Sequence, residues 1–143
     1  MARLRVLFVD DEDELVSAVT ERLELRGIDA VGATNGHDAL ERATQEDFNV
    51  VVLDLRMPGL DGLDVIRTLH QTQPELKVVM MSGHGSAEAR QEGLRLGAFD
   101  YLQKPVDIEL LARTMRQAYR KVEESKEAEA LADAADAENE TTD

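Results

Sequence analysis

Five short apolar runs, each followed by a segment with helical spacing of its apolar residues, constrain this chain more than any other feature. The clearest run, 50–53, reads Val-Val-Val-Leu and ends at Asp54. Such a run suits a strand that is covered on both faces, as in a parallel sheet. The strands are predicted at 4–9, 28–31, 50–53, 77–81 and 99–102, and the helices at 15–23, 37–45, 65–69, 87–96 and 108–118. This alternation predicts an α/β fold, a doubly wound sandwich of a five-stranded parallel sheet and five helices.

Length and composition narrow the class of protein further. The 143 residues suffice for one domain with a core, and no run of 18 apolar residues is present to span a membrane. The N-terminal apolar stretch is interrupted by Arg5 and stops at an acidic pair, which is too short for a secretory signal. The chain has no cysteine, so disulfides are excluded and a cytoplasmic location is expected.

The charge of the chain is unevenly distributed. Of the net charge of −14, residues 122–143 contribute −8, from nine acids and one lysine. This stretch is rich in Ala and Glu and has no large apolar stripe. We therefore predict a folded domain at 1–121 and an acidic tail at 122–143 that is disordered or a frayed extension of the last helix. The acidity argues against direct binding to nucleic acid or to an anionic membrane.

Chemically useful side chains follow the predicted strands. In open parallel sheets, ligands bind beyond the carboxyl ends of the strands, and the polar residues found there are Asp10, Asp11, Asp54, Ser82 and Lys104. Clustered carboxylates repel one another unless a cation lies among them, and oxygen ligands of this kind suit Mg²⁺. A carboxylate can also attack phosphorus, with Lys104 neutralising phosphoryl oxygens and Ser82 donating a hydroxyl.

Each of these residues also has a plainer interpretation. The acidic cluster 10–13 can cap the next helix and favour its first turn, and Ser82 can cap the fourth helix. Lys104 with Pro105 can be a solvated turn, and Tyr101 can be ordinary sheet packing. The coincidence of acids, hydroxyl and lysine at one edge of the sheet favours a functional site.

The segments around these residues resemble a known family. The chain from Arg3 to about Arg120 is similar to the receiver domain of two-component response regulators. The matching segments are 6–11, 52–62, 80–83 and 100–105. The resemblance implies a flavodoxin-like (CheY-like) sheet of strand order 2-1-3-4-5, in which the first and third strands are neighbours.

The same resemblance implies roles for the acids. Asp54 would accept a phosphoryl group from a phosphohistidine of a sensor histidine kinase or a histidine phosphotransfer protein. Mg²⁺, for which Mn²⁺ could substitute, would be held by Asp11, Asp54 and the backbone carbonyl of Arg56, with Asp10 acting mainly through water. Arg56 and His84 would tune dephosphorylation. The chain would then be a signalling phosphoacceptor and no enzyme in the usual sense, because it catalyses only its own phosphorylation and dephosphorylation.

Further residues carry the implied switch. Lys104 would pair with the phosphoryl oxygens, and its peptide bond to Pro105 is expected to be cis. Ser82 would move toward the phosphoryl group and Tyr101 would turn inward behind it. The face built from the fourth helix, the fifth strand and the fifth helix would then signal to a downstream protein target or form a phosphorylation-dependent homodimer.

Two other classes of α/β protein fit the sequence less well. A Mg²⁺-dependent phosphohydrolase of the haloacid dehalogenase type could use Asp11 and Asp13, but Leu15 departs from its signature and the chain has no room for a cap. A flavodoxin needs a loop rich in Ser, Thr or Gly after the first strand, where the acidic loop 10–14 would repel a phosphate.

The chain could be a stand-alone regulator or one domain of a larger regulator. No helix-turn-helix, Walker or cyclase-like segment follows residue 121. We favour a stand-alone regulator that acts by protein contact. The alternative is a receiver within a larger regulator, with residues 122–143 as a linker toward a DNA-binding, ATPase or kinase output domain.

Overall fold

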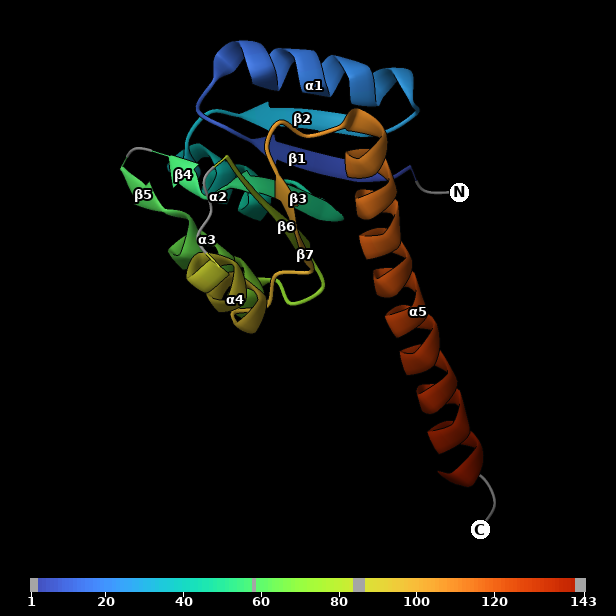
Figure 1. The fold of residues 1–143 in the computed structure, drawn as a ribbon. Helices are drawn as coiled ribbons and strands as arrows, with labels where there is room; N and C mark the ends of the chain where they lie inside the picture. Colours follow the sequence, from blue (N-terminus) through green and yellow to red (C-terminus); the bar gives the residue numbers. More distant parts are fainter. Residues whose placement is uncertain (1–2, 58, 84–86, 141–143) are drawn as a thin grey trace.

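The structure, a computed structural model, describes residues 3–57, 59–83 and 87–140, without the side chains of residues 60, 125 and 135–140. Its centre is a parallel sheet of five strands in the order β2-β1-β3-β6-β7 (Figure 1). Numbered along the chain, these strands have the predicted order 2-1-3-4-5, which confirms the predicted fold. The strands are β1 (Arg5–Val9), β2 (Asp29–Ala33), β3 (Val50–Asp54), β6 (Lys77–Ser82) and β7 (Asp100–Gln103).

Five helices cover the two faces of this sheet. They are α1 (Asp13–Leu25), α2 (Gly36–Gln45), α3 (Gly62–Thr72), α4 (Ala87–Arg95) and α5 (Ile108–Glu140). Helices α1 and α5 pack on one face, and α2, α3 and α4 lie on the other (Figure 1). Local signals set their ends: the Asn35 side chain accepts a hydrogen bond from the Asp38 N–H at the start of α2, and Gly27 follows α1 at φ +78°.

The side chains of the central strands alternate between two cores. Leu7, Val51 and Leu53 point toward α2 and α3, whereas Phe8 and Val52 point toward α1 and α5. All five residues of β3 are buried because both of its faces are covered. This explains its continuous apolar sequence and leaves Asp54 as the only acid of the strand.

A small antiparallel hairpin follows β3. Strands β4 (Arg56–Met57) and β5 (Leu60–Asp61) pair with Arg56 opposite Asp61, in a segment for which the sequence predicted no strand. The Asp61 side chain then caps α3 by accepting a hydrogen bond from the Leu63 N–H. The hairpin thus connects the end of β3 to the start of α3.

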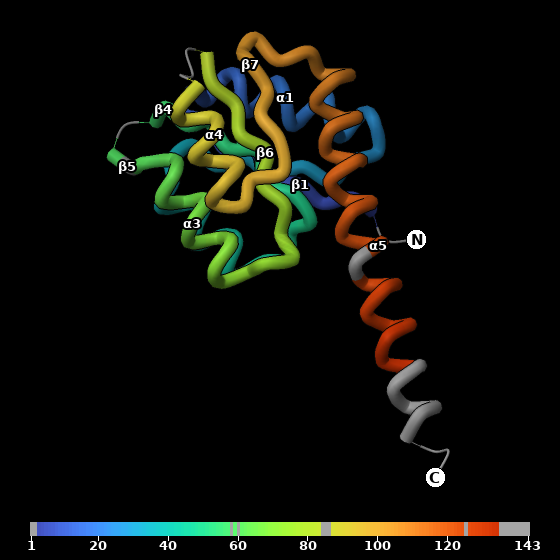
Figure 2. The backbone as a smooth tube through the Cα atoms, turned by 60° about the horizontal axis from the view of Figure 1, so that its bottom comes forward, coloured from blue at the N-terminus to red at the C-terminus, as the bar shows by residue number. Residues whose placement is uncertain are grey.

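Helix α5 continues past the domain boundary that was predicted at residue 121. Val122 is buried, and the described side chains of residues 123–134, with 125 left out, are exposed. In Figure 2 this part of α5 extends away from the sheet. The structure is therefore helical through Glu140, and fraying of this extension stays a prediction. In the part of the chain that the structure describes, no helix combines the length and the apolar character needed to cross a membrane.

Candidate functional site

The predicted acids meet at the carboxyl ends of two neighbouring strands. Because β1 pairs with β3, with Val9 opposite Leu53, Asp10 after β1 lies beside Asp54 at the end of β3. Asp10 and Asp54 are buried, whereas Asp11 is exposed. One carboxylate oxygen from each of the three lies within 4.8 Å of the others. The sequence prediction of an acidic cluster at this edge agrees with this geometry.

Lys104 supplies a cation to the two buried carboxylates. It follows β7, and its Nζ lies 2.5 Å from Asp10 Oδ2 and donates a hydrogen bond of 3.0 Å to Asp54 Oδ2. Burial alone would lower the pKa of Lys104, but the contacts and charges of Asp10 and Asp54 outweigh burial and raise this pKa above its ordinary value of 10.5. Lys104 therefore stays charged at neutral pH.

Backbone N–H groups fix the other oxygens of the buried pair. Asp10 Oδ1 accepts a hydrogen bond of 3.0 Å from the Glu12 N–H, and Asp54 Oδ1 accepts one of 2.9 Å from the Arg56 N–H. Each carboxylate is thus anchored on one oxygen, and its second oxygen faces Lys104. This orientation presents Oδ2 of Asp54 to the inside of the site.

The donor set fits a hard divalent cation. Asp10 Oδ2 is buried and accepts no hydrogen bond from the described residues, although the Lys104 ammonium lies beside it. Three carboxylates face one ammonium, so negative charge is in excess at the site. Exposed Asp11 leaves a route for hydrated ions from solvent. Carboxylate oxygens with access to water are ligands that Mg²⁺ takes, so these residues suit the predicted ion.

The predicted switch residues lie next to this cluster. Ser82 is the last residue of β6 and is buried, and its carbonyl accepts a hydrogen bond of 3.0 Å from the Lys104 N–H. Tyr101 lies in β7 and is half-buried, and the guanidinium carbon of Arg90 lies 5.3 Å from its ring centroid. The contact between Arg90 and Tyr101 was missed from the sequence, which carries no signal for a pair between two different elements. It places a cation of α4 on the predicted switch tyrosine.

The remaining predicted residues are placed as follows. The Lys104–Pro105 peptide bond is cis. Arg56 is exposed in β4, and His84 lies outside the described residues. The plainer interpretation of the acidic cluster holds in part: Asp13 lies in the first turn of α1, where acids are favourable, but Glu12, the N-cap, makes no side-chain capping hydrogen bond. Ser82 ends β6 five residues before α4 begins, so it is not the N-cap of α4.

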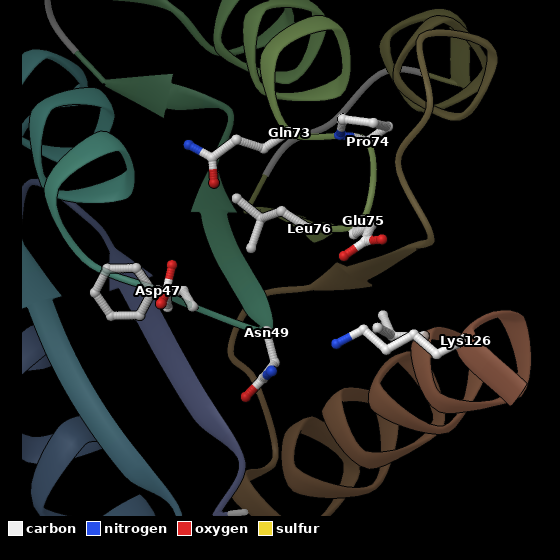
Figure 3. Close-up of a pocket in the computed structure, with 9 residues that line it drawn as sticks. Asp47, Asn49, Gln73, Pro74, Glu75, Leu76 and Lys126 are labelled. Carbon is white, nitrogen blue, oxygen red and sulfur yellow. The ribbon is translucent and has the colours of Figure 1, made fainter. Parts of the chain in front are cut away.

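Two pockets lie at opposite ends of the strands, and the first is next to the acidic cluster. A groove of about 470 Å³ between α1 and the start of α5 lies next to it, lined by Leu15, Lys104, Ile108 and other residues, mostly apolar. A larger pocket of about 660 Å³ lies near Asn49 and Leu76, which precede β3 and β6 (Figure 3). This larger pocket is at the amino ends of the strands, so it lies at the opposite edge of the sheet from Asp54.

The fold and this acidic edge together define a receiver-type domain, and comparison with known proteins agrees. A family model described as response regulator receiver domain matches residues 6–116. The chain is 36% identical over 118 residues to the C4-dicarboxylate transport transcriptional regulatory protein DctD of Pseudomonas aeruginosa, covering 82% of this chain and 25% of that protein. The chain therefore belongs to the response regulator receiver domain family of two-component systems.

Solved structures agree with this assignment. A CheY-like receiver domain protein from Methanospirillum hungatei matches with a TM-score of 0.83 and 26% identity, over 87% of this chain and 99% of that one. The beryllofluoride-activated NtrC4 receiver domain, solved as a dimer, matches with a TM-score of 0.78 and 31% identity, over 82% and 98% of the two chains. Curated relatives are longer proteins, and the chain spans 25% to 57% of their length.

Proposed function

We propose that Asp54 accepts a phosphoryl group from a phosphohistidine on a partner protein, and that the chain acts as a signalling phosphoacceptor. The observation that carries this proposal is the position of Asp54: a buried carboxylate at the end of the central strand, 3.0 Å from Lys104 Nζ and beside Asp10 and Asp11. A solvated capping residue would need neither burial nor a dedicated cation.

The chemical step uses groups that are already oriented. Oδ1 of Asp54 is held by the Arg56 N–H, so we assign Oδ2 as the attacking oxygen. It forms a bond to phosphorus as the phosphorus–nitrogen bond of the donor breaks, and the imidazole leaves with a proton taken up from solvent. Attack of water on phosphorus later releases inorganic phosphate and returns the carboxylate. Lys104, already beside Oδ2, pairs with the phosphoryl oxygens and stabilises their charge.

Receiver domains generally bind Mg²⁺ through an acidic pocket, and here Asp10, Asp11 and Asp54 would hold it, with the backbone carbonyl of Arg56. The bound ion would neutralise charge on the phosphoryl oxygens during transfer, and Mn²⁺, which takes similar oxygen ligands, should substitute for it. The negative charge that remains after Lys104 pairs with the two buried carboxylates supports this assignment.

Phosphorylation would act on the ends of β6 and β7. The phosphoryl group adds a charge of roughly −1.5 to −2 and three strong acceptors. Ser82 and Lys104 are joined by a backbone hydrogen bond, so a pull on both side chains moves the two loops together. Tyr101 would turn inward, which requires its contact with Arg90 to change. The face of α4, β7 and α5 would then present a different surface. We expect Arg56 and His84 to set how long the phosphoryl group persists.

The partners follow from the same assignment. Response regulator receivers interact with histidine kinases and with output domains. For this chain we propose a sensor histidine kinase or histidine phosphotransfer protein as donor, and the apolar groove between α1 and α5 beside Lys104 as its docking surface. Further proposals are a downstream protein target, a cytoplasmic location, no direct contact with nucleic acid or membrane, and a phosphorylation-dependent homodimer. The last of these is supported by the beryllofluoride-activated NtrC4 receiver domain, which is a dimer. Action as a stand-alone regulator and action within a longer one both remain compatible with the longer relatives.

The experiment is phosphorylation by acetyl phosphate, followed by intact mass measurement. With Mg²⁺, the wild-type chain should gain one phosphoryl group, and a chelator should abolish the gain. Asp54→Asn should gain none, whereas Asp64→Asn, an exposed aspartate of α3, should behave as the wild type. A mass gain that persists in Asp54→Asn would contradict the proposal. Continuous phosphate release by Asp54→Asn from a phosphomonoester would instead support a hydrolase that uses Asp11.

A further inference from the structure

Helix α5 carries opposite charges on its two halves. Between residues 109 and 121 it has four cations and one acid, and between 123 and 140 it has eight acids and one lysine. The basic half packs on the domain, while the acidic half extends beyond it (Figure 1). The sign of the charge changes at Val122, the last of the described side chains of α5 that is buried. The basic half is unusual in a chain of net charge −14.

One exposed stripe runs along both halves of α5. Its basic part contains Leu110, Arg113, Gln117 and Arg120, which lie on the side opposite the buried residues Leu111, Met115, Ala118 and Val122. Its acidic part continues with Glu124, Glu127, Leu131 and Ala134 at the same three- and four-residue spacing. Leu110 is 41% exposed and Leu131 is 72% exposed, so each half of the stripe carries one solvent-exposed leucine.

Among the described residues, the cations on the exposed side of α5 form few ion pairs within the chain. Among the described residues, Arg113 and Arg120 form no ion pair, and Lys121 makes only a long contact of 3.6 Å with Glu124. An exposed helical segment with no tertiary packing is only marginally stable in water, even when it is rich in alanine. We therefore expect the acidic half of α5 to be stabilised by packing against another surface.

We propose that α5 pairs in antiparallel fashion with α5 of a second copy of this chain, the two helices crossing at Val122. In this register Arg120 lies opposite Glu124 of the second copy. Gln117 lies opposite Glu127, and Arg113 lies opposite Leu131. Leu110 then lies about one helical turn from Leu131 of the second copy, so each end of the paired region has an apolar contact.

Charge complementarity favours α5 of a second copy as the partner, and it favours the antiparallel orientation. A parallel pair would place basic halves together and acidic halves together, which is repulsive. The basic half of α5 cannot fold back to pair with the acidic half of the same helix, because α5 is continuous from Ile108 to Glu140. In an antiparallel pair with two-fold symmetry, the basic half of each helix faces the acidic half of the other. The two contact regions are then identical, as closed symmetry requires. The surface needs no phosphoryl group, so this pairing is independent of Asp54 chemistry and is expected to weaken as salt is raised.

Disulfide cross-linking tests the register, and the chain has no native cysteine to interfere. Gln117→Cys and Glu127→Cys chains, mixed and mildly oxidised, should form a disulfide-linked heterodimer. Gln117→Cys alone should not link to itself, since the two copies of residue 117 are far apart in the antiparallel pair. Gln91→Cys, exposed on α4, measures random collision. Linking of Gln117→Cys alone, or mixed linking no greater than that of Gln91→Cys, would overturn the proposal.

Charge reversal tests the driving force in solution. Sedimentation over a concentration series should show wild-type association. Arg113→Glu with Arg120→Glu, or Glu124→Lys with Glu127→Lys, should weaken it at least tenfold. Mixing these two variants should restore association as a heterodimer, because each reversed half then meets its complement. Arg67→Glu with Arg95→Glu, on α3 and α4, should associate as the wild type does. A monomeric wild type, or a reversed variant that alone associates as tightly as the wild type, would rule the pairing out.

Discussion

At the scale of single residues, Lys104 determines whether the acidic site is stable without a metal ion. Its Nζ contacts both buried carboxylates, at 2.5 Å from Asp10 and 3.0 Å from Asp54. Lys104→Met keeps most of the side-chain volume but leaves two buried anions facing each other. Loss of a partner from a fully buried pair costs about 3–5 kcal/mol, and Lys104 is partly exposed, so we expect a loss of about 2 kcal/mol in the free energy of unfolding without Mg²⁺.

Urea unfolding with and without Mg²⁺ measures this effect. Added Mg²⁺ should recover more stability in Lys104→Met than in the wild type, because the ion replaces the missing cation. Lys126→Met, an exposed lysine of α5, should change stability by no more than about 0.5 kcal/mol. An unchanged free energy of unfolding in Lys104→Met would show that the lysine is not held by these carboxylates.

The raised pKa of Lys104 gives a separate prediction for pH. A raised pKa in the folded state stabilises the protein fully below the unfolded value of 10.5, and this contribution is lost as the pH rises through the folded value. The stability difference between the wild type and Lys104→Met should therefore be constant from about pH 7 to pH 9 and shrink only above about pH 10.5. A difference that shrinks below about pH 9 would contradict the ion pairs described for this site.

Most site residues could be predicted because their positions follow from strand ends. Asp10 and Asp54 come directly after apolar runs and Lys104 directly follows β7, and a parallel sheet gathers such positions at one edge. The sequence could not separate buried Asp10 from exposed Asp11, since the side-chain direction after a strand depends on the loop geometry. The Arg90–Tyr101 contact depends on how α4 packs beside β7, which no local pattern encodes.

At the scale of elements, the packing of α4 on the sheet depends on Gly93. A Cβ at this position would lie 2.0 Å from Met80 Sδ and 2.9 Å from Met80 Cε, and Met80 is fully buried. Gly93→Ala should gain up to about 1 kcal/mol of helix propensity but lose about 1–3 kcal/mol to overpacking. We expect net destabilisation of about 1–2 kcal/mol.

A double-mutant cycle in urea isolates this clash. Met80→Ala removes the colliding atoms, so Gly93→Ala should be neutral or stabilising in that background. Gln91→Ala, at an exposed position of α4, should shift stability by less than about 0.5 kcal/mol. Equal destabilisation by Gly93→Ala in both backgrounds would show that α4 does not pack on Met80.

Element prediction succeeded where the apolar periodicity was long, and it missed the two short strands β4 and β5. Five strands and five helices were found because each has several apolar residues at regular spacing. The β4–β5 hairpin was not predicted, because strands of two residues are too short to show an alternating apolar pattern. The continuation of α5 was uncertain because its alanines and acids support a helix by propensity without marking a buried face.

At the scale of the whole molecule, we expect the cluster of Asp10, Asp11 and Asp54 to make the stability of the fold depend on divalent ions. An ion that binds only the folded state stabilises it by about 2.7 kcal/mol at one hundred times its dissociation constant. The Tm should therefore rise with MgCl₂ beyond the effect of NaCl at equal ionic strength, and Asp11→Asn should lose most of this rise. The measurement is thermal unfolding followed by circular dichroism. An equal rise in Asp11→Asn would place the ion elsewhere, for example on the acidic half of α5.

The central claim is that Asp54 is the residue that carries the phosphoryl group. Its most direct test is chemical identification of the acceptor: the chain is phosphorylated with acetyl phosphate and Mg²⁺, reduced with borohydride, digested and sequenced by mass spectrometry. Reduction converts an aspartyl phosphate to homoserine, so homoserine should appear at position 54 in the treated chain and be absent when the phosphodonor is omitted. Homoserine at Asp10 or Asp11, or at no position, would contradict the account.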